Sequence, residues 1–266
     1  MRICIVVIMM LFLQACAILG PPTELDDTKG NSVEKIYDKA SQKMTDRDYR
    51  KAIDYLKKLE SRFPNSKYAA QAQLDTAYLH YKLEESAQAV SAAERFIKIH
   101  PNHPNLDYAY YIKGVAYFRQ RGITEKISQQ DISDRDPKTL YSSFLAFKDL
   151  VTLFPESKYS KDAKERMIYL KNKLADHELH AARYYMNIKA YVAALNRAKY
   201  VLENYPNSSF TEEALVLSIS AYDYLEMNDL KEDTIRVLKQ NFPESHIFNQ
   251  GKETKKKDWW KFWDKD

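Results

Sequence analysis

The chain has 266 residues, few glycines (five) and a formal net charge of +4 at neutral pH. This charge is too modest for a typical nucleic-acid-binding protein, which concentrates basic residues on one face. No alternating strand pattern occurs after residue 30, so we predict an all-α fold. We find no glycine-rich phosphate loop, nucleophile elbow or paired-carboxylate motif, and therefore expect neither an enzyme nor a bound cofactor or nucleic acid.

Residues 1–15 have the pattern of a bacterial lipoprotein signal peptide. Arg2 is the only charged residue, residues 3–13 are all apolar, and the segment leads into Cys16. It is too short to cross a bilayer as a stable helix. We expect cleavage before Cys16 and a covalent lipid on its thiol and new amino group. The alternative is a plain secretory signal with an incidental cysteine.

The residues after Cys16 predict where the protein is held. Aspartate directly after the cysteine would resemble an inner-membrane retention signal, so Ala17 favours lipid anchoring in the outer membrane. Residues 17–31 have the composition of a flexible tether. Ser32 then has the character of an N-cap, and Glu34 places acidic charge in the first turn of the following helix.

From residue 32 to residue 248 one short pattern recurs. An aromatic residue or histidine precedes proline, then asparagine or glutamate and usually serine, at prolines 64, 101, 155, 206 and 243. Proline ends a helix, and the serine could cap the next one. A repeat period in the thirties predicts a tetratricopeptide-like solenoid of five helix pairs.

We expect these pairs at the following ranges: 33–45 and 48–63; 66–82 and 85–99; 107–120 and 138–153; 160–187 and the helix leading to Pro206; 209–227 and 230–241. Two departures stand out. Residues 121–137 form an inserted loop in the third pair, and residues 160–187 contain no proline or glycine, which predicts one long helix.

Several motifs of the third and fourth pairs resemble the BamD family, the tetratricopeptide lipoproteins of the outer-membrane β-barrel assembly machinery. They are His103-Pro104-Asn105 with Tyr111 and Gly114, residues 133–137 (Ser-Asp-Arg-Asp-Pro), and residues 166–185 with their paired tyrosines. The resemblance covers residues 16 to about 248. It implies lipid attachment at the periplasmic face of the outer membrane. It also implies a scaffold that binds the POTRA domains of the barrel protein BamA, other Bam lipoproteins, and the C-terminal signal of unfolded outer-membrane β-barrel proteins.

In a tetratricopeptide array the first helix of each pair lines the concave face. We expect the peptide-binding groove to be lined by Tyr37, Met44, Leu74, Tyr78, Tyr81, Tyr111, Phe118 and Arg119. An aromatic groove with a basic rim suits a strand that ends in aromatic residues and a carboxylate. The alternative is that about half of these side chains pack between repeats. For the POTRA contact we select the other end of the array: Arg183, Asn196, Arg197, Asp223, Tyr224 and Met227.

The tail, residues 249–266, is basic and contains all three tryptophans of the chain. The residues that define it are Lys255, Lys256, Lys257, Trp259, Trp260 and Trp263. An interfacial membrane anchor and a docking segment for a partner protein both have this composition. The third alternative is a disordered end.

Two further interpretations were considered. His177 and His180 lie three residues apart, which is not the spacing of a zinc-protease motif, and no third ligand is evident, so we predict no metal site. A pilotin-like tetratricopeptide lipoprotein, which helps to localise a secretin, would share the anchor and the repeats and is the main alternative function. The inserted loop and the long helix argue against it.

Overall fold

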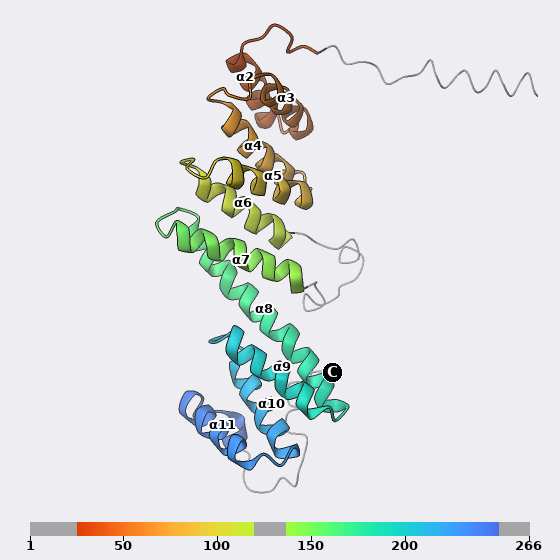
Figure 1. Cartoon of the computed structure of the whole chain (residues 1–266), viewed down its shortest axis with the longest axis vertical. Helices are drawn as coiled ribbons and strands as arrows, with labels where there is room; N and C mark the ends of the chain where they lie inside the picture. The colour runs from red at the N-terminus through yellow and green to blue at the C-terminus, as the bar shows by residue number, and fades with distance from the viewer. Residues whose placement is uncertain (1–25, 120–136, 250–266) are drawn as a thin grey trace, which may run out of the picture. The chain divides into compact units, whose positions relative to one another are not determined.

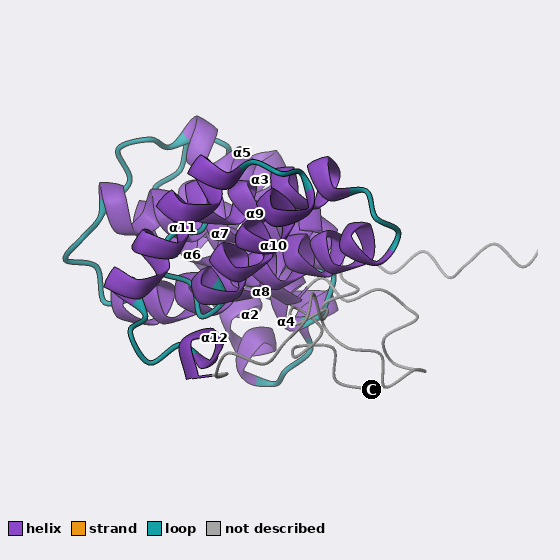
Figure 2. Ribbon diagram, turned by 90° about the horizontal axis from the view of Figure 1, so that it is seen from below, coloured by secondary structure: helices purple, strands orange, loops and turns teal. Residues whose placement is uncertain are grey.

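A computed structural model describes residues 26–119 and 137–249, and the regular structure within these ranges is entirely helical (Figures 1 and 2). The all-α prediction is therefore confirmed. Cys16, the tryptophan-rich tail from residue 250 and the insertion up to residue 136 lie outside the described ranges. Among the helices that are described, none is both long and apolar enough to cross a bilayer.

The helices form five successive pairs followed by a short last helix. They are α2 (Val33–Thr45) and α3 (Tyr49–Arg62), α4 (Ala69–Lys82) and α5 (Ser86–Ile99), α6 (Leu106–Arg119) and α7 (Pro137–Leu153), α8 (Ser160–Asn187) and α9 (Tyr191–Asn204), α10 (Thr211–Tyr224) and α11 (Asn228–Asn241), and α12 (His246–Asn249). The helix bounds agree with the predicted ranges to within about three residues, and the long helix α8 spans 160–187 as expected. The tetratricopeptide-like fold of five pairs is confirmed.

The chain divides into two compact units, with the boundary between Ala72 and Gln73 inside α4. In the first unit α2 packs against α3. In the second unit each helix from α5 to α10 packs against the next one in the chain, and α8 also contacts α10 (Figure 1). The alanines that face neighbouring helices, such as Ala163 and Ala214, are fully buried, which allows the helices to approach closely.

The links between pairs share one backbone conformation. The carbonyl of Phe63 accepts a hydrogen bond from the N–H of Ser66, and the carbonyl of Ser66 accepts one from Ala69. The same two bonds recur in the links that begin at His100, Phe154, Tyr205 and Phe242. Phe63 has φ −130° and ψ 54°, which lies outside the helical region that a following proline disfavours. The repeated sequence pattern therefore encodes a repeated double turn.

The serines of these links do not cap helices with their side chains as we expected. The helix begins three residues after Ser66, and the Ser66 hydroxyl is buried with no partner among the described residues. In the third link the Ser157 hydroxyl donates to Asp107 at 2.6 Å and accepts from the N–H of Tyr159, which precedes the helix, at 3.2 Å. The main-chain hydrogen bonds, rather than the serine hydroxyl, are the feature that all five links share. Ser32, in contrast, does cap α2 through its side chain, which accepts from the N–H of Lys35.

Four tight turns inside the pairs place a non-glycine residue in the left-handed region. These residues are Arg47, Glu84, Lys189 and Glu226, with φ between 59° and 63°. The residue after each one donates its N–H to the carbonyl five positions earlier, which satisfies groups left open at the helix end. The left-handed conformation costs a residue with a side chain roughly 1–2 kcal/mol. The sequence thus closes these turns without glycine, which accounts in part for its low glycine content.

One glycine inside a helix is needed for close packing. Gly114 of α6 lies against the fully buried ring of Phe147 in α7, and a Cβ atom at this position would stand 2.5 Å from Cε1 of that ring. The Ser143 hydroxyl also donates to the Gly114 carbonyl at 2.9 Å. The contact between α6 and α7 therefore has no room for a larger residue.

Gly114→Ala is expected to lower the free energy of unfolding by roughly 1–3 kcal/mol, because overpacking costs more than the gain in helix propensity. Urea unfolding followed by circular dichroism measures this loss. In a Phe147→Leu background the same substitution should cost much less, since the ring that it strikes is gone. An equal cost in both backgrounds would show that the Phe147 contact is not the constraint.

Candidate binding surfaces

Aromatic and charged side chains from three first helices come together in the second unit. Each member of this set is half-buried, so it is held in place and still reaches the surface. We call the set the aromatic–arginine cluster; it consists of Tyr78 and Tyr81 of α4, Tyr108, Tyr111, Phe118 and Arg119 of α6, and Tyr159, Asp162 and Arg166 at the start of α8. Such a set combines flat apolar rings with groups that bind carboxylates.

Stacked rings form the middle of the cluster. Tyr159 stacks on Tyr108 with ring centres 5.1 Å apart and on Tyr111 at 4.7 Å. Tyr78 continues the row, with its ring 6.4 Å from that of Tyr108. Burial and the neighbouring phenol groups raise the pKa of Tyr108, so its hydroxyl stays protonated and can donate a hydrogen bond.

Asp162 organises the polar part of the cluster. Its Oδ2 accepts a hydrogen bond from the Tyr111 hydroxyl at 2.9 Å and from Nε of Arg166 at 2.6 Å. Burial opposes ionisation of Asp162, but these two donors outweigh it and hold the pKa of the carboxyl below its usual value. Burial and the bond to Asp162 together raise the pKa of Tyr111 to about 12. Asp162 is therefore charged and Tyr111 neutral at physiological pH.

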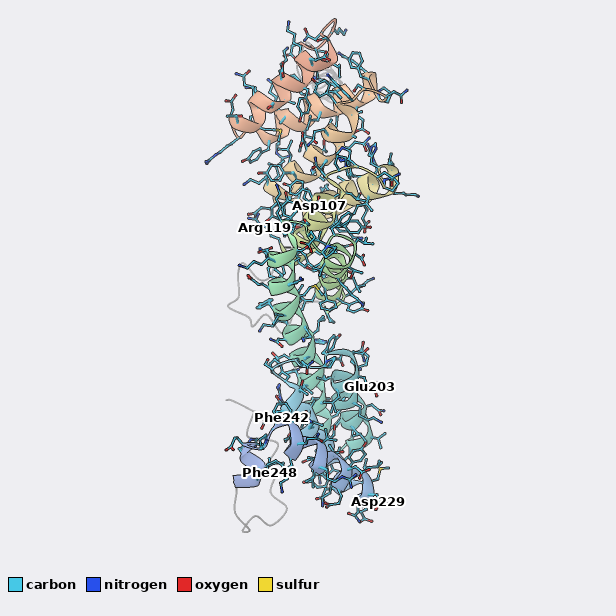
Figure 3. All side chains as sticks on the ribbon, turned by 90° about the vertical axis from the view of Figure 1, so that its left-hand side faces the viewer. Asp107, Arg119, Glu203, Asp229, Phe242 and Phe248 are labelled. Carbon is cyan, nitrogen blue, oxygen red and sulfur yellow. The ribbon has the colours of Figure 1, made fainter. Side chains whose placement is uncertain are left out.

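Two arginines lie over aromatic rings of the cluster. The Arg166 guanidinium is 5.0 Å from the centre of the Phe118 ring, and Arg119 is 5.4 Å from that of Tyr81. Arg119 is the last residue of α6 and is labelled in Figure 3, as is Asp107 in the first turn of the same helix. Its side chain is 40% exposed and pairs with Glu84 at 2.6 Å. Arg119 is the more accessible of the two, and an exposed pair of this kind is easily exchanged for another carboxylate.

The structure brings together five of the eight groove residues predicted from sequence: Tyr78, Tyr81, Tyr111, Phe118 and Arg119. The prediction that Leu74 lines the groove was wrong, because its side chain is 0% exposed and belongs to the hydrophobic core. Tyr37 and Met44 lie in the first unit and are both half-buried. The Tyr37 ring lies 5.0 Å from that of Tyr68 in the same unit.

Sequence reasoning missed Tyr108, Tyr159, Asp162 and Arg166. The repeated link motif does, however, indicate one of these residues, Tyr159. Tyr159 ends the third copy of the link motif as Tyr68 ends the first, and each is preceded by a lysine whose Nζ lies 5.0 Å from the ring centre. Tyr68 and Tyr159 both contact a tyrosine of an earlier first helix, Tyr37 or Tyr111. Aligning the repeats would have placed Tyr159 in the cluster.

The prediction that Arg183 is an exposed docking residue was wrong. Its side chain is 14% exposed and forms two hydrogen bonds with Glu213, at 2.6 and 3.1 Å. Asp176 adds a third contact at 3.6 Å, and Glu213 itself is only 3% exposed. Burial opposes the charge on Arg183, but the two carboxylates outweigh it and raise the pKa. The residue thus joins α8 to α10 inside the protein.

Other residues selected for partner binding do lie near the surface. Tyr224 stacks on Tyr191 with ring centres 4.3 Å apart, and Met227 is 43% exposed. Asn196 and Leu225 line an open hollow of about 500 Å³ with Tyr191, next to Val192, which is 58% exposed. We call Tyr191, Val192, Asn196, Tyr224, Leu225 and Met227 the turn surface.

Two charged residues selected for partner binding are already paired with neighbours. Arg197 binds Glu178 at 2.8 Å and is 47% exposed, and Asp223 accepts from Lys231 at 3.0 Å. Neither is buried, so each can add polar contacts around an apolar docking site. Within the described ranges no group of three or more possible metal ligands occurs, and His177 and His180 form no such cluster.

Arg183→Met is expected to lower the free energy of unfolding by roughly 3–5 kcal/mol, because it removes the guanidinium that donates two hydrogen bonds to the buried Glu213 carboxylate. Arg197→Met is the matched control, since its pair with Glu178 is more exposed and should contribute less than about 1 kcal/mol. Urea unfolding of both variants measures the difference. Similar losses would contradict the structural role assigned to Arg183.

Comparisons with known proteins point to one outer-membrane protein family over most of the chain. A family model described as "YfiO: Outer membrane lipoprotein" matches residues 29–238. The outer membrane protein assembly factor BamD of Neisseria gonorrhoeae is 42% identical over 98% of this chain and 99% of its own length, and that of Vibrio cholerae is 32% identical over 78% and 86%. The solved structure of a tetratricopeptide protein of Thermus thermophilus covers 82% of this chain and 95% of its own, with 13% identity and a TM-score of 0.37, too low to support any argument.

Proposed function

Because this chain belongs to the BamD family of outer membrane protein assembly factors, we propose that it is a lipid-anchored scaffold that binds two kinds of protein. One is the C-terminal segment of unfolded outer-membrane β-barrel proteins. The other is the POTRA region of the barrel subunit. Its place among the outer-membrane assembly factors and its non-catalytic role follow from the family.

The anchor of this scaffold is the lipid that we propose on Cys16. The sequence before it has the length and apolarity of a lipoprotein signal, and the matching family is described as an outer membrane lipoprotein. Two or more acyl chains on one cysteine give stable membrane attachment. We propose that this lipid lies in the inner leaflet of the outer membrane, with the described helices in the periplasm.

The aromatic–arginine cluster is the observation that carries the proposed binding of unfolded barrel proteins. An extended strand presents alternate side chains to one face, so aromatic residues near its end can rest on Tyr78 and Tyr81. Arg119 at the exposed edge of the cluster can release Glu84 and donate hydrogen bonds to the terminal carboxylate instead. Arg166 is less available, because Asp162 already occupies it.

The turn surface is the proposed contact for the POTRA region. The exposed side chain of Val192 lines an open hollow together with polar Asn196 and with Leu225, and the exposed Met227 follows Leu225 by two residues. This arrangement of an apolar centre with a polar margin is typical of protein–protein interfaces. The pilotin-like alternative is not favoured, since the chain belongs to a different, outer-membrane assembly family.

Replacing both Tyr78 and Tyr81 with alanine should weaken binding of a peptide from the C-terminus of a barrel protein by about 10-fold or more, since lost aromatic anchors commonly cost ~1–3 kcal/mol each. Fluorescence anisotropy with a labelled peptide measures the affinity. Tyr141→Ala with Tyr184→Ala is the matched control, because these rings are 46% and 59% exposed outside the cluster.

The same assay tests the role of Arg119. A peptide with an amidated C-terminus should bind the parent protein less tightly than the free acid, and Arg119→Gln should abolish this preference. A melting curve for each variant establishes that the fold is intact. Equal peptide affinity in the intact double tyrosine variant and the parent would refute the assignment of the cluster.

Val192→Glu should reduce the affinity for isolated POTRA domains by at least 10-fold, because it introduces an unpaired charge into the apolar centre of the turn surface. Isothermal calorimetry with the soluble Cys16→Ser protein provides the measurement. Ile168→Glu makes the same change at a side chain that is 59% exposed on α8, and should have no effect. Equal loss of affinity in both variants would point to a general charge effect instead.

A further inference from the structure

The last residues of the predicted tether are not free of the folded chain. Residues 26–31 form a series of turns that lead directly into α2. The N–H of Lys29 donates to the Asp26 carbonyl and that of Asn31 to the Thr28 carbonyl, while the Asn31 side chain donates to the Asp27 carbonyl at 2.9 Å. These bonds fix the backbone before the Ser32 cap.

Asp26 and Thr28 bind the C-terminal half of α3. Thr28 is 0% exposed, and its hydroxyl donates to Asp26 Oδ1 at 2.5 Å while accepting from Nη1 of Arg62 at 2.7 Å. Arg62 Nη2 also donates to Asp26 Oδ2, and Lys58 Nζ lies 3.7 Å from Asp26 Oδ1. A short segment from outside the repeats thus buries a polar side chain with its hydrogen bonds satisfied.

Asp27 binds both helices of the first pair. Lys39 of α2 donates to the Asp27 carbonyl at 2.8 Å and to its Oδ2 at 2.9 Å. The Tyr55 hydroxyl of α3 donates to the same Oδ2 at 2.8 Å. The two consecutive aspartates therefore meet three cations and a phenol that come from two different helices.

This arrangement shows charge complementarity of the kind found at docking sites. Lys39 lies on α2 between Lys35 and Lys43 at intervals of four, so these side chains share one face of the helix. Lys58 and Arg62 also lie four residues apart on α3. An acidic segment that enters between two basic helix faces is attracted to both.

We propose that residues 26–28 are an anchor latch, an ion-paired docking segment that fixes where the lipid-linked N-terminal segment leaves the first unit. The inference rests on the proposed lipid at Cys16 for its functional meaning, but the docking itself does not depend on that lipid. The latch converts part of a tether into a fixed exit point on α2 and α3.

The latch limits how far the first unit can stand from the membrane. Asp26 is ten positions after Cys16, so a fully extended chain between them spans at most about 36 Å. With the latch open the free chain would run from Cys16 to Val33, seventeen positions, and could span about 60 Å. Docking therefore keeps the first pair of helices close to the lipid surface.

The latch should be insensitive to pH over the physiological range. The hydrogen bond from Thr28, supported by Arg62 and Lys58, lowers the pKa of Asp26 to about 2. Because the folded pKa lies below the unfolded one, the contribution of this carboxylate is fully present above pH 4 and is lost only as pH falls toward 2. High salt, in contrast, should weaken the partly exposed ion pairs.

Pulsed electron paramagnetic resonance on the full mature chain tests this proposal. The chain is produced from residue 16 onward, without Cys4, so Cys16→Ser leaves no native cysteine and allows spin labels at the exposed positions Lys29→Cys and Lys57→Cys. In the latched protein we expect a single narrow distance distribution. Asp26→Asn with Asp27→Asn should at least double its width, and Arg62→Gln should broadly reproduce the effect from the other side of the ion pair.

Glu34→Gln with Asp38→Asn is the matched control, because it removes two exposed carboxylates of α2 that take no part in the latch. A narrow distribution in the control, a broad one in the latch variants and unchanged circular dichroism in all would support the proposal. A distribution in the parent as broad as in the latch variants, or equal broadening in the control, would overturn it. Loss of lipidation would instead appear as release of the wild-type chain from the membrane and would leave these distances unchanged.

Discussion

The double turn at each proline is the constraint on which the rest of the structure depends. Proline removes an N–H and keeps the preceding residue out of the helical region, so every second helix of a pair ends at the same kind of position. Two successive hydrogen bonds then start the next helix, three residues after Ser66 and three after Ser157. Because the chain reverses in the same way in the first and third links, the tyrosine that ends each of them, Tyr68 or Tyr159, reaches an earlier first helix. The stack of Tyr159 on Tyr111 is a direct result of this geometry.

Close helix contacts, and turns that contain no glycine, make the arrangement of the helix pairs rigid. Fully buried alanines let adjacent helices approach, and Gly114 allows the Phe147 ring to touch the α6 backbone. The tight turns inside pairs instead use residues such as Lys189 in the left-handed conformation. A side chain restricts the unfolded chain more than glycine does, which offsets part of the cost of that conformation. The pairs are thus held by the shapes of their contacts and by hydrogen bonds at their ends.

Local features could be predicted from the sequence, and features that depend on distant partners could not. Helix bounds follow from prolines and apolar periodicity, so α8 was placed correctly at 160–187. Leu74 and Arg183 were assigned to surfaces because their helix positions permit it. Whether such a residue is buried depends on its neighbours in space. Arg183, for example, is held by Glu213, thirty residues further along the chain.

The predicted tether, residues 17–31, also makes contacts with distant residues that the sequence could not predict. Its composition indicates flexibility, and nothing near Asp26 in the sequence reveals that Arg62 will bind it thirty-six residues away. The aromatic–arginine cluster lies between the two cases. Its residues on α4 and α6, except Tyr108, were predicted from the position of first helices in such repeats, while Tyr159 required the repeats to be aligned with one another.

The charge balance of the cluster has a consequence for the way in which it can bind an unfolded chain. Asp162 neutralises Arg166, and Glu84 partly neutralises Arg119, so the cluster presents rings with little excess charge. Aromatic faces accept many apolar side chains, which makes binding tolerant of sequence. A ligand carboxylate must displace Glu84 to reach Arg119, so its net gain is modest because one ion pair is exchanged for another. An assembly factor has to release each barrel protein after binding it, and a neutralised aromatic surface is suited to such reversible contact.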